Sequence, residues 1–419
     1  MSPQALARAG VATPLAPLPH PRAGERVRGP ARRPALRSPG DAGLTHALEH
    51  LLFRGAGPYP SAGALLARFA ELGRSPRPSD DALVITWDLE PAALEPGLEL
   101  LGELLLRPRY HGFAAEVEVI REELLEGLDE RGRPTAPEDL LRGIVFAGHP
   151  LARPILGDEA GLRRLTPERV DAWRQRLVQR ENVVVAAAGP VGQDAWTAAT
   201  ACLDQLPAGA RLPEPAPPPE LPPALRFVDT GSGPQVELWL ALRGPGRAAP
   251  EFAAFEVVHA LLDGGPAAAL TTELVDSGLS YDAQASLSAF PECSLLELNL
   301  SVARPKLNAA LEATAALLGQ LWTRVTPEAL AALQATDARR LRWAADDPTA
   351  AAEDLALAAL RGEPLDPAAA LARRAAAGLE AVQAQARALA EPARRHGLVL
   401  GEVSATHRRR ARRLFDQTW

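Results

Sequence analysis

The sequence has few of the residues that crosslink a protein or anchor it in a membrane. Its only cysteines, Cys202 and Cys293, cannot form a disulfide framework or, without other ligands, a zinc site, and a reducing compartment fits them. No run approaches the roughly 20 apolar residues that a membrane helix needs. The apolar stretch Ala5–Leu15 is interrupted by Arg8 and Pro14, which argues against a signal peptide. We therefore expect a cytoplasmic protein.

An excess of positive charge is also absent. The chain has 45 Lys and Arg residues against 52 Asp and Glu residues, a formal net charge of −7, whereas general nucleic-acid binding requires a basic face. The basic run Arg408–Arg413 is more typical of a solvated tail. At 419 residues the chain exceeds the size at which a single core stops growing, so we expect two domains.

Helical periodicity dominates the chain from Ala42 onward. Residues 1–42 are rich in Pro, Gly and Arg without a sustained period, and we expect an irregular N-terminal segment there. Apolar spacing predicts helices at Ala42–Arg54, Ser61–Gly73, Pro91–Leu106, Phe113–Asp129, Ala136–Ala147 and Pro167–Gln179. Short β-branched runs predict strands at Leu83–Leu89 and Asn182–Ala188.

A proline-rich segment divides the chain. Leu206–Ala224 holds eight prolines in nineteen residues, which no helix or strand interior tolerates, so it is predicted to be a linker. Beyond it, strands are predicted at Val236–Leu242, Ser280–Ala289, Ser294–Val302 and Gly397–Gly401. Helices are predicted at Pro250–Leu262, Ala268–Asp276, Pro305–Leu321, Pro327–Trp343, Thr349–Arg361 and Pro367–Ala388.

The order of elements repeats after the linker. Helix Pro91–Leu106 corresponds to Pro305–Leu321 at an offset of roughly 215 residues, which predicts tandem α+β domains over residues 43–205 and 225–419. The same offset places the counterpart of strand Val236–Leu242 near Pro21–Arg28, where the sequence is a poor strand. Either the first domain lacks one strand, or its N-terminal sequence is unusual for its fold.

The segment His46-Ala47-Leu48-Glu49-His50 carries the clearest chemical signal. On a helix, His46 and His50 project from one face and can chelate one metal ion. Glu49 lies beside them and can approach a water that the metal activates without being a ligand. A zinc ion makes such a water acidic, and a carboxylate can accept its proton during attack on a carbonyl.

A catalytic zinc site usually needs a third protein ligand. Helix Phe113–Asp129 offers several carboxylates: Glu116, Glu118, Glu122, Glu123 and Glu126. The spacing alone does not choose among them. The alternative is that the two histidines and Glu49 form a solvated helix face, but the mostly apolar or small residues after His50 favour partial burial, and a buried cluster of this kind requires a partner such as a metal.

The motif Gly43-Leu44-x-His46-x-x-Glu49-His50-x-x-Phe53-x-Gly55 resembles the pitrilysin/insulinase/mitochondrial-processing-peptidase family of zinc metallopeptidases, whose signature is H-x-x-E-H. The resemblance continues at Gly148-His149-Pro150-Leu151 and Gly278-Leu279-Ser280-Tyr281. In that family a helix carries two glutamates seven positions apart, which fall here on Glu116 and Glu123.

The resemblance implies a role for each of these residues. His46, His50 and Glu123 are the expected ligands of one zinc ion per chain, Glu49 is the expected general base, and Glu116 supports the ligand set from outside it. The implied fold is a tandem pair of domains, each with a mainly antiparallel sheet packed by helices, forming half of a clam-shell chamber. The implied reaction is hydrolysis of peptides or unfolded segments.

Three features depart from the family pattern. The β-strands that family members carry before the zinc helix are not recognisable in residues 1–42. The Asn-Ala-x-Thr stretch that often leads into the substrate-binding edge strand is replaced by Arg74–Asp81, although Ala82–Leu89 still fits an edge strand that could pair with a peptide. Active members also use an Arg and a Tyr to contact substrate. Tyr281 is present, whereas the position of the Arg is held by Val275 or Leu274.

The missing Arg bears on the partner and on activity. It predicts that the chain is the zinc-carrying subunit of a heterodimer, whose homologous partner carries the Arg/Tyr pair. The complete motif favours an endopeptidase. A non-catalytic assembly subunit is the alternative, which the missing Arg and the unusual N-terminus favour.

Overall fold

The computed structural model describes residues 43–419 except 74–76, 80–82, 131, 213–215, 232, 265–267, 345–346 and 364, and three short strands before residue 43. The chain forms two compact units. Unit 1 comprises Met1–Glu126, Pro154–Pro215 and Arg339–Ala370, and unit 2 comprises Gly127–Arg153, Ala216–Ala338 and Leu371–Trp419. Neither unit is one continuous stretch, so the units in space differ from the continuous domains expected over 43–205 and 225–419.

Unit 1 is built on an antiparallel sheet with the strand order β4-β5-β3-β6. Its strands are β3 (Glu25–Arg28), β4 (Arg77–Ser79), β5 (Val84–Leu89) and β6 (Ala186–Ala188), beside a separate hairpin of β1 (Leu6–Arg8) and β2 (Val11–Thr13). Its helices are α1 (Leu44–Leu52), α2 (Ala62–Leu72), α3 (Leu94–Leu106), α4 (Phe113–Glu126), α6 (Glu159–Leu162), α7 (Pro167–Leu177), α8 (Gln193–Thr200) and α12 (Pro348–Arg361).

Two expectations about this sheet are corrected. Strand β3 lies between β5 and β6, so the segment 1–42 is not wholly irregular, and the first domain has a strand where the sequence pattern was poor. Strand β5 is not an edge, because β4 pairs with it and occupies that position. Pro78 lies in β4, and an edge strand tolerates a proline that cannot donate to the ladder.

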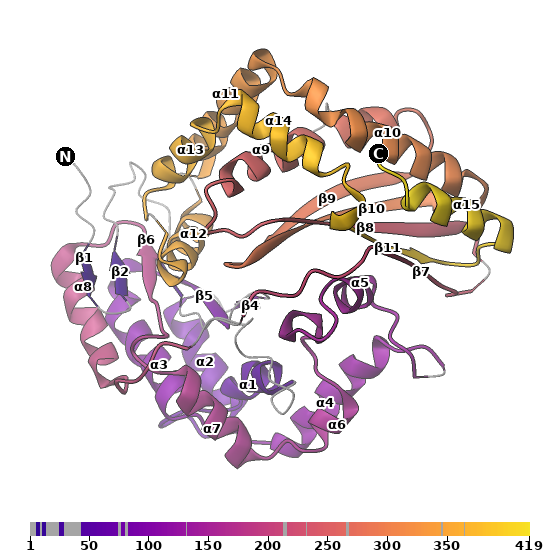
Figure 1. Ribbon diagram of the computed structural model, residues 1–419. Helices are drawn as coiled ribbons and strands as arrows, with labels where there is room; N and C mark the ends of the chain where they lie inside the picture. Colours follow the sequence, from indigo (N-terminus) through magenta and orange to yellow (C-terminus); the bar gives the residue numbers. More distant parts are fainter. Residues whose placement is uncertain are drawn as a thin grey trace. The chain divides into compact units, whose positions relative to one another are not determined.

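Unit 2 is built on a mixed sheet with the order β7-β11-β8-β10-β9, in which only β7 and β11 pair in parallel. Its strands are β7 (Ala224–Val228), β8 (Gln235–Pro245), β9 (Asp282–Ala289), β10 (Cys293–Ala303) and β11 (Arg395–Leu400). Its helices are α5 (Pro137–Val145), α9 (Phe252–Asp263), α10 (Leu307–Arg324), α14 (Leu379–Ala388) and α15 (Ala405–Phe415), with the first part of α11 (Pro327–Ala344) and the end of α13 (Pro367–Ala375). Figure 1 shows α10 and α14 on one face of the sheet and α5 on the other.

The expected α+β class with two similar halves is confirmed. The strand order β6-β3-β5-β4 in unit 1 matches β11-β8-β10-β9 in unit 2. In each unit a short 3₁₀ turn, Pro91–Ala93 or Arg304–Lys306, leads directly into the long helix α3 or α10. The other short turns are at Pro150–Ala152, Ala201–Gln205 and Pro392–Arg394, with one π-helical turn at Thr271–Val275.

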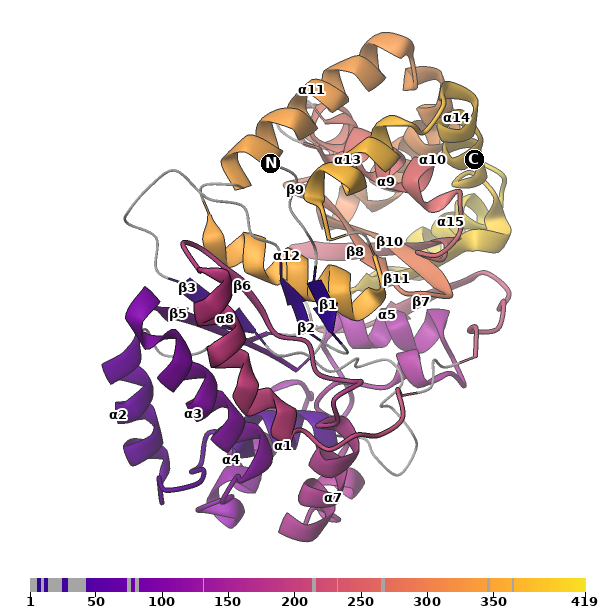
Figure 2. The same cartoon turned by 90° about the vertical axis from the view of Figure 1, so that its left-hand side faces the viewer.

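One helix from each half of the chain belongs to the unit of the other half. Helix α5 follows α4 in the chain, yet its buried Leu141 and Val145 pack with Trp239 and Leu398 of the unit 2 sheet. Helix α12 follows α11, yet its residues, including Leu355, pack against the sheet of unit 1. Figure 2 shows α12 beside β6.

Most predicted helices are confirmed to within a few residues, and three further predictions are wrong. The expected helix Pro367–Ala388 is two helices, because Gly378 adopts an extended backbone that caps α14. Strand β6 covers only the last three residues of the range Asn182–Ala188. The run Arg408–Arg413 is not a tail but part of α15, anchored by buried Phe415. Among the described residues, no helix is long and apolar enough to cross a bilayer.

Candidate metal centre

Helix α1 is fixed in unit 1 by its apolar face. Leu48, Leu51 and Leu52 are fully buried, and burial of each such side chain contributes about 1.5–3 kcal/mol. The helix begins at Gly43, which has φ +80° and would place a Cβ only 2.9 Å from the Leu156 carbonyl oxygen. Only glycine adopts this backbone conformation at the start of α1 without strain. Gly43 therefore determines where α1 begins and where His46 and His50 lie on it.

Helix α4 lies beside α1 and presents two glutamates to it. Ile120 and Leu124 face the core. Glu116 and Glu123 are seven residues apart, which is two helical turns, so both lie on one side of α4. The packing of these two helices therefore brings the carboxylates of α4 to the imidazoles of α1.

The structure brings together His46, His50 and Glu123. Glu123 Oε2 lies 3.0 Å from His46 Nε2 and 3.5 Å from His50 Nε2. One ligand atom from each of the three residues lies within 4.8 Å of the others. Tetrahedral zinc with bonds of 2.0–2.1 Å separates its ligand atoms by about 3.3 Å. The two separations that involve Glu123 lie on either side of that value, so the donor set is compatible with one zinc ion.

Glu116 occupies a different position in the cluster. Its Oε1 lies 3.0 Å from His50 Nδ1, while its Oε2 lies 3.1 Å from Arg54 Nη1. A carboxylate that accepts from Nδ1–H fixes the tautomer of an imidazole and leaves the Nε2 lone pair for a metal. The side chain of Glu116 is 12% exposed against 39% for Glu123, so the supporting carboxylate is the more buried one.

The loop before α4 is held to α7. The Tyr110 hydroxyl donates to Asp171 Oδ1 at 3.1 Å, and Asp171 also accepts from Arg174 on α7. Burial, reinforced by the charge of Asp171, raises the pKa of Tyr110 well above its usual range. Helix α7 contacts α1 as well, where the Trp173 indole N–H donates to Thr45. Both helices of the cluster are thus tied to α7.

The remaining predicted residues lie around or apart from this cluster. Glu49 is half-buried and lies on α1 directly before His50. The other carboxylates of α4, namely Glu118, Glu122 and Glu126, are exposed and do not belong to the ligand cluster. Tyr281 lies in unit 2 before β9, and its side chain is 81% exposed. Leu274, at the expected position of an Arg, is fully buried.

Arg54 was not singled out by the sequence. It occupies one of the variable positions of the motif, and its charge alone carries no signal. The signal that could have found it is its spacing, since a helix predicted over Ala42–Arg54 would place it on the face of His50, although α1 itself ends at Leu52.

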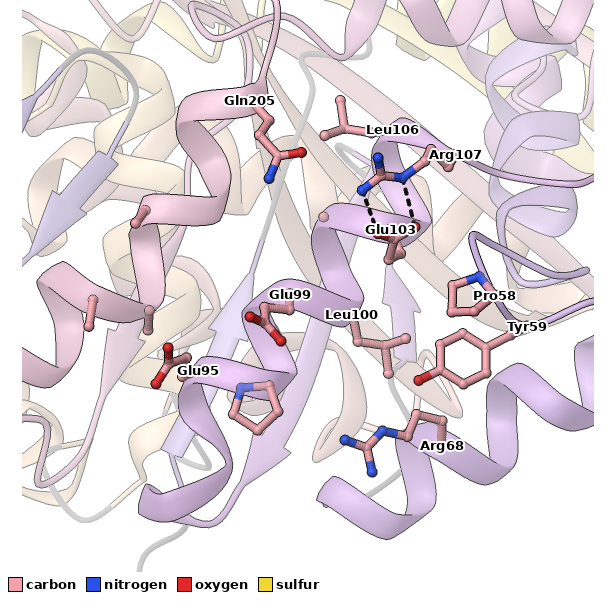
Figure 3. A pocket seen from close by; sticks show the side chains of 15 residues that line it. Pro58, Tyr59, Arg68, Glu95, Glu99, Leu100, Glu103, Leu106, Arg107 and Gln205 are labelled. Carbon is pink, nitrogen blue, oxygen red and sulfur yellow. Dashed lines mark hydrogen bonds and ion pairs between the residues drawn. The ribbon is translucent and has the colours of Figure 1, made fainter.

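A cavity of roughly 550 Å³ lies elsewhere in unit 1, and its lining contains none of the cluster residues. Figure 3 shows Tyr59, Arg68, Glu99 and Gln205 around it. The Arg107 guanidinium bonds both oxygens of Glu103 on its wall. The cavity is separate from the candidate metal centre.

Comparison with known proteins supports the family expected from the sequence. Residues 164–336 match the family described as Peptidase M16 inactive domain. Uncharacterized zinc proteases of Mycobacterium leprae and Mycobacterium bovis are 29% and 30% identical to the chain over 277 and 278 residues. The aligned segment is 61% of this chain and 59% or 60% of those proteins, so the chain spans less than two thirds of their length.

Solved structures share the fold. A protease from Helicobacter pylori superposes with a TM-score of 0.84 at 17% identity, over 96% of this chain and 99% of that chain. A peptidase M16 inactive domain from Pseudomonas fluorescens gives 0.81 at 19% identity, over 97% and 99%. At these identities the solved structures show the fold alone, and the similarity to M16 peptidases in sequence rests on residues 164–336 and on the zinc protease relatives.

Proposed function

We propose that the chain is a zinc-dependent endopeptidase that hydrolyses peptides or unfolded segments. The observation that carries the proposal is the convergence of His46, His50 and Glu123 at separations that fit zinc, with Glu49 on the same helix. The relatives named zinc proteases support it. The matched M16 segment lies outside these residues, so the proposal depends on the cluster.

Metal binding and proton transfer are carried out by different residues of the cluster. His46 Nε2, His50 Nε2 and one oxygen of Glu123 would hold the ion. When bound, zinc supplies a Lewis acid that activates water and polarises the scissile carbonyl. Glu49 accepts a proton from water as the water oxygen bonds to the carbonyl carbon, and delivers it to the amide nitrogen as the C–N bond breaks. One water is consumed, and one carboxyl and one amino group are released.

We also propose that a homologous partner subunit completes substrate binding. Tyr281 is exposed, whereas Leu274 and Val275 provide no charged group for a substrate carbonyl. A second copy of this chain would have the same deficiency. A partner that carries an Arg beside its Tyr would supply the missing charge-assisted hydrogen bond.

A non-catalytic assembly subunit is the second candidate. The observation that favours it is the match of residues 164–336 to a domain described as inactive, together with the absent Arg. An assembly subunit has no need of a general base or of a complete ligand set, so the two proposals differ in what Glu49 does.

The deciding experiment is the Glu49→Gln variant. Glutamine keeps the shape of the side chain but cannot accept a proton, so zinc content should stay at that of the unaltered chain while peptide hydrolysis falls roughly 10²–10⁴-fold. Glu122→Gln, which changes an exposed carboxylate on α4, is the matched control and should keep both zinc content and peptide hydrolysis. Unchanged turnover in zinc-replete Glu49→Gln protein would exclude the mechanism, and no turnover in any form, measured with the homologous partner present, would favour the assembly subunit.

A further inference from the structure

Arg54 connects the end of α1 to the start of α4 through several contacts. Its Nε donates to the His111 carbonyl at 3.2 Å, and its Nη1 lies 3.1 Å from Glu116 Oε2. Gly112, with φ +72°, passes so close that an added Cβ would lie 3.1 Å from Nη2. The guanidinium therefore covers the turn at which the chain enters α4, and it does so four residues after His50.

The two oxygens of Glu116 have different partners. One faces His50 Nδ1 at 3.0 Å and the other faces the Arg54 guanidinium at 3.1 Å. Rotation about the last torsion of a glutamate and about the imidazole torsion of a histidine is only weakly restricted. A carboxylate held from both sides cannot turn without breaking one contact, so Arg54 restricts Glu116, and Glu116 restricts the ring of His50.

We propose that Arg54 is a positioning residue for the metal centre, acting through Glu116 to hold the imidazole of His50 in its metal-binding orientation. The inference rests on the proposed zinc site. Arg54 bonds the His111 carbonyl and Glu116 rather than the ligand atoms, so we expect its effect on the geometry and affinity of the site. Groups that orient a metal-ligating histidine typically change metal affinity 10–100-fold.

The direction in which zinc affinity changes when Arg54 is removed distinguishes a positioning role from a purely electrostatic one. A guanidinium close to a dication repels it, so removal of the charge alone would tighten zinc binding. Loss of positioning would weaken it. If Arg54 were only an ordinary surface ion pair, its removal would leave zinc affinity unchanged, because such a pair affects the stability of the fold and affects it little.

The test is the zinc dissociation constant of the full chain, measured by competition with a chromophoric chelator. Arg54→Ala should bind zinc 10–100-fold more weakly, and its cobalt(II) absorption spectrum should change because the ring of His50 is no longer fixed. Arg54→Lys, which keeps the charge but not the two-sided guanidinium, should lie between the two. Arg68→Ala is the matched control, since Arg68 is 33% exposed against 32% for Arg54 and makes one ion pair, to Glu71 at 2.9 Å.

A double-mutant cycle tests the route through Glu116. If Arg54 acts through that carboxylate, Arg54→Ala should have no further effect on zinc affinity in a Glu116→Ala background. Losses that simply add, or tighter zinc binding by Arg54→Ala, would overturn the inference. Thermal unfolding of the metal-free variants identifies misfolding, and Arg54→Lys carries the test if Arg54→Ala does not fold.

The outcomes distinguish this inference from the proposed function. An unaltered chain that binds no zinc in the same titration would overturn both. An unaltered chain that binds one zinc, with Arg54→Ala equal to it within threefold and an identical cobalt spectrum, would overturn the positioning role alone and leave the zinc site intact.

Discussion

His396 makes unit 2 sensitive to acid. The residue lies in β11 and its side chain is fully buried. Burial, together with the charge of Arg243, lowers the pKa of His396 from 6.5 to about 4, and the Pro222 backbone acts in the opposite direction. The imidazole is therefore neutral in the folded protein near pH 7.

The sign of the effect follows from proton binding. Between pH 6.5 and 4 an unfolded chain binds a proton at this histidine and the folded chain does not, so unfolding becomes more favourable as the pH falls. The contribution is complete above pH 6.5 and is lost towards pH 4. At about 1.4 kcal/mol per pH unit over this window, the loss reaches about 3 kcal/mol.

Urea denaturation followed by tryptophan fluorescence at pH 7.5 and pH 4.5 measures this loss. A chelator should be present so that acid release of metal does not contribute. The loss of unfolding free energy on acidification should be about 2–3 kcal/mol smaller in His396→Leu than in the unaltered chain. His111→Gln, which changes an exposed imidazole, should behave as the unaltered chain does. Equal losses in all three proteins would refute the reasoning.

Further predictions concern the metal centre and the partner. Metal analysis should give one zinc per chain, with strong loss in His46→Ala, His50→Ala and Glu123→Ala but not in Glu126→Ala. Zinc retained in Glu123→Ala and lost in Glu126→Ala would mean that Glu126, not Glu123, is the ligand. Removal of zinc by a chelator should lower the unfolding temperature, because bound zinc at 100 times its dissociation constant adds about 2.7 kcal/mol to the free energy of unfolding. Peptide hydrolysis should rise 10-fold or more, for a contact worth about 1.5–3 kcal/mol, when a homologue with the Arg/Tyr pair is added. High activity of the isolated chain, undiminished in Tyr281→Phe, would contradict that.

The candidate site could be predicted from the sequence only to the extent that it lies on one helix. The four-residue spacing of His46 and His50 determines that both face one way, and the structure has them with ring centroids 4.5 Å apart. Periodicity could not choose among the five glutamates of α4, since the choice depends on how α4 rotates against α1. That choice came from the family resemblance. The contact of Arg54 with Glu116 depends on the same rotation.

The fold shows the same division between local and long-range information. Amphipathic helices such as α3 and α10 were predicted because their apolar faces are periodic. Strand β3 was missed because Glu25–Arg28 lacks that pattern, and pairing with β5 and β6 determines its conformation. The exchange of α5 and α12 was also beyond prediction, because an apolar helix face does not specify which of two similar sheets it will cover.

The duplicated scaffold shows why function cannot be carried over from the fold. Both units share strand order and the 3₁₀ turn before their long helix, yet within the described residues a cluster able to hold a metal occurs in unit 1 alone. In unit 2, His259 of α9 instead lies 3.1 Å from the Ala285 carbonyl, so its imidazole is engaged by the sheet. One architecture thus accommodates a metal centre or none, depending on a few side chains. The similarity at 17% identity to the Helicobacter pylori protease therefore reaches the fold alone, and the case for peptide hydrolysis depends on His46, His50, Glu123 and Glu49.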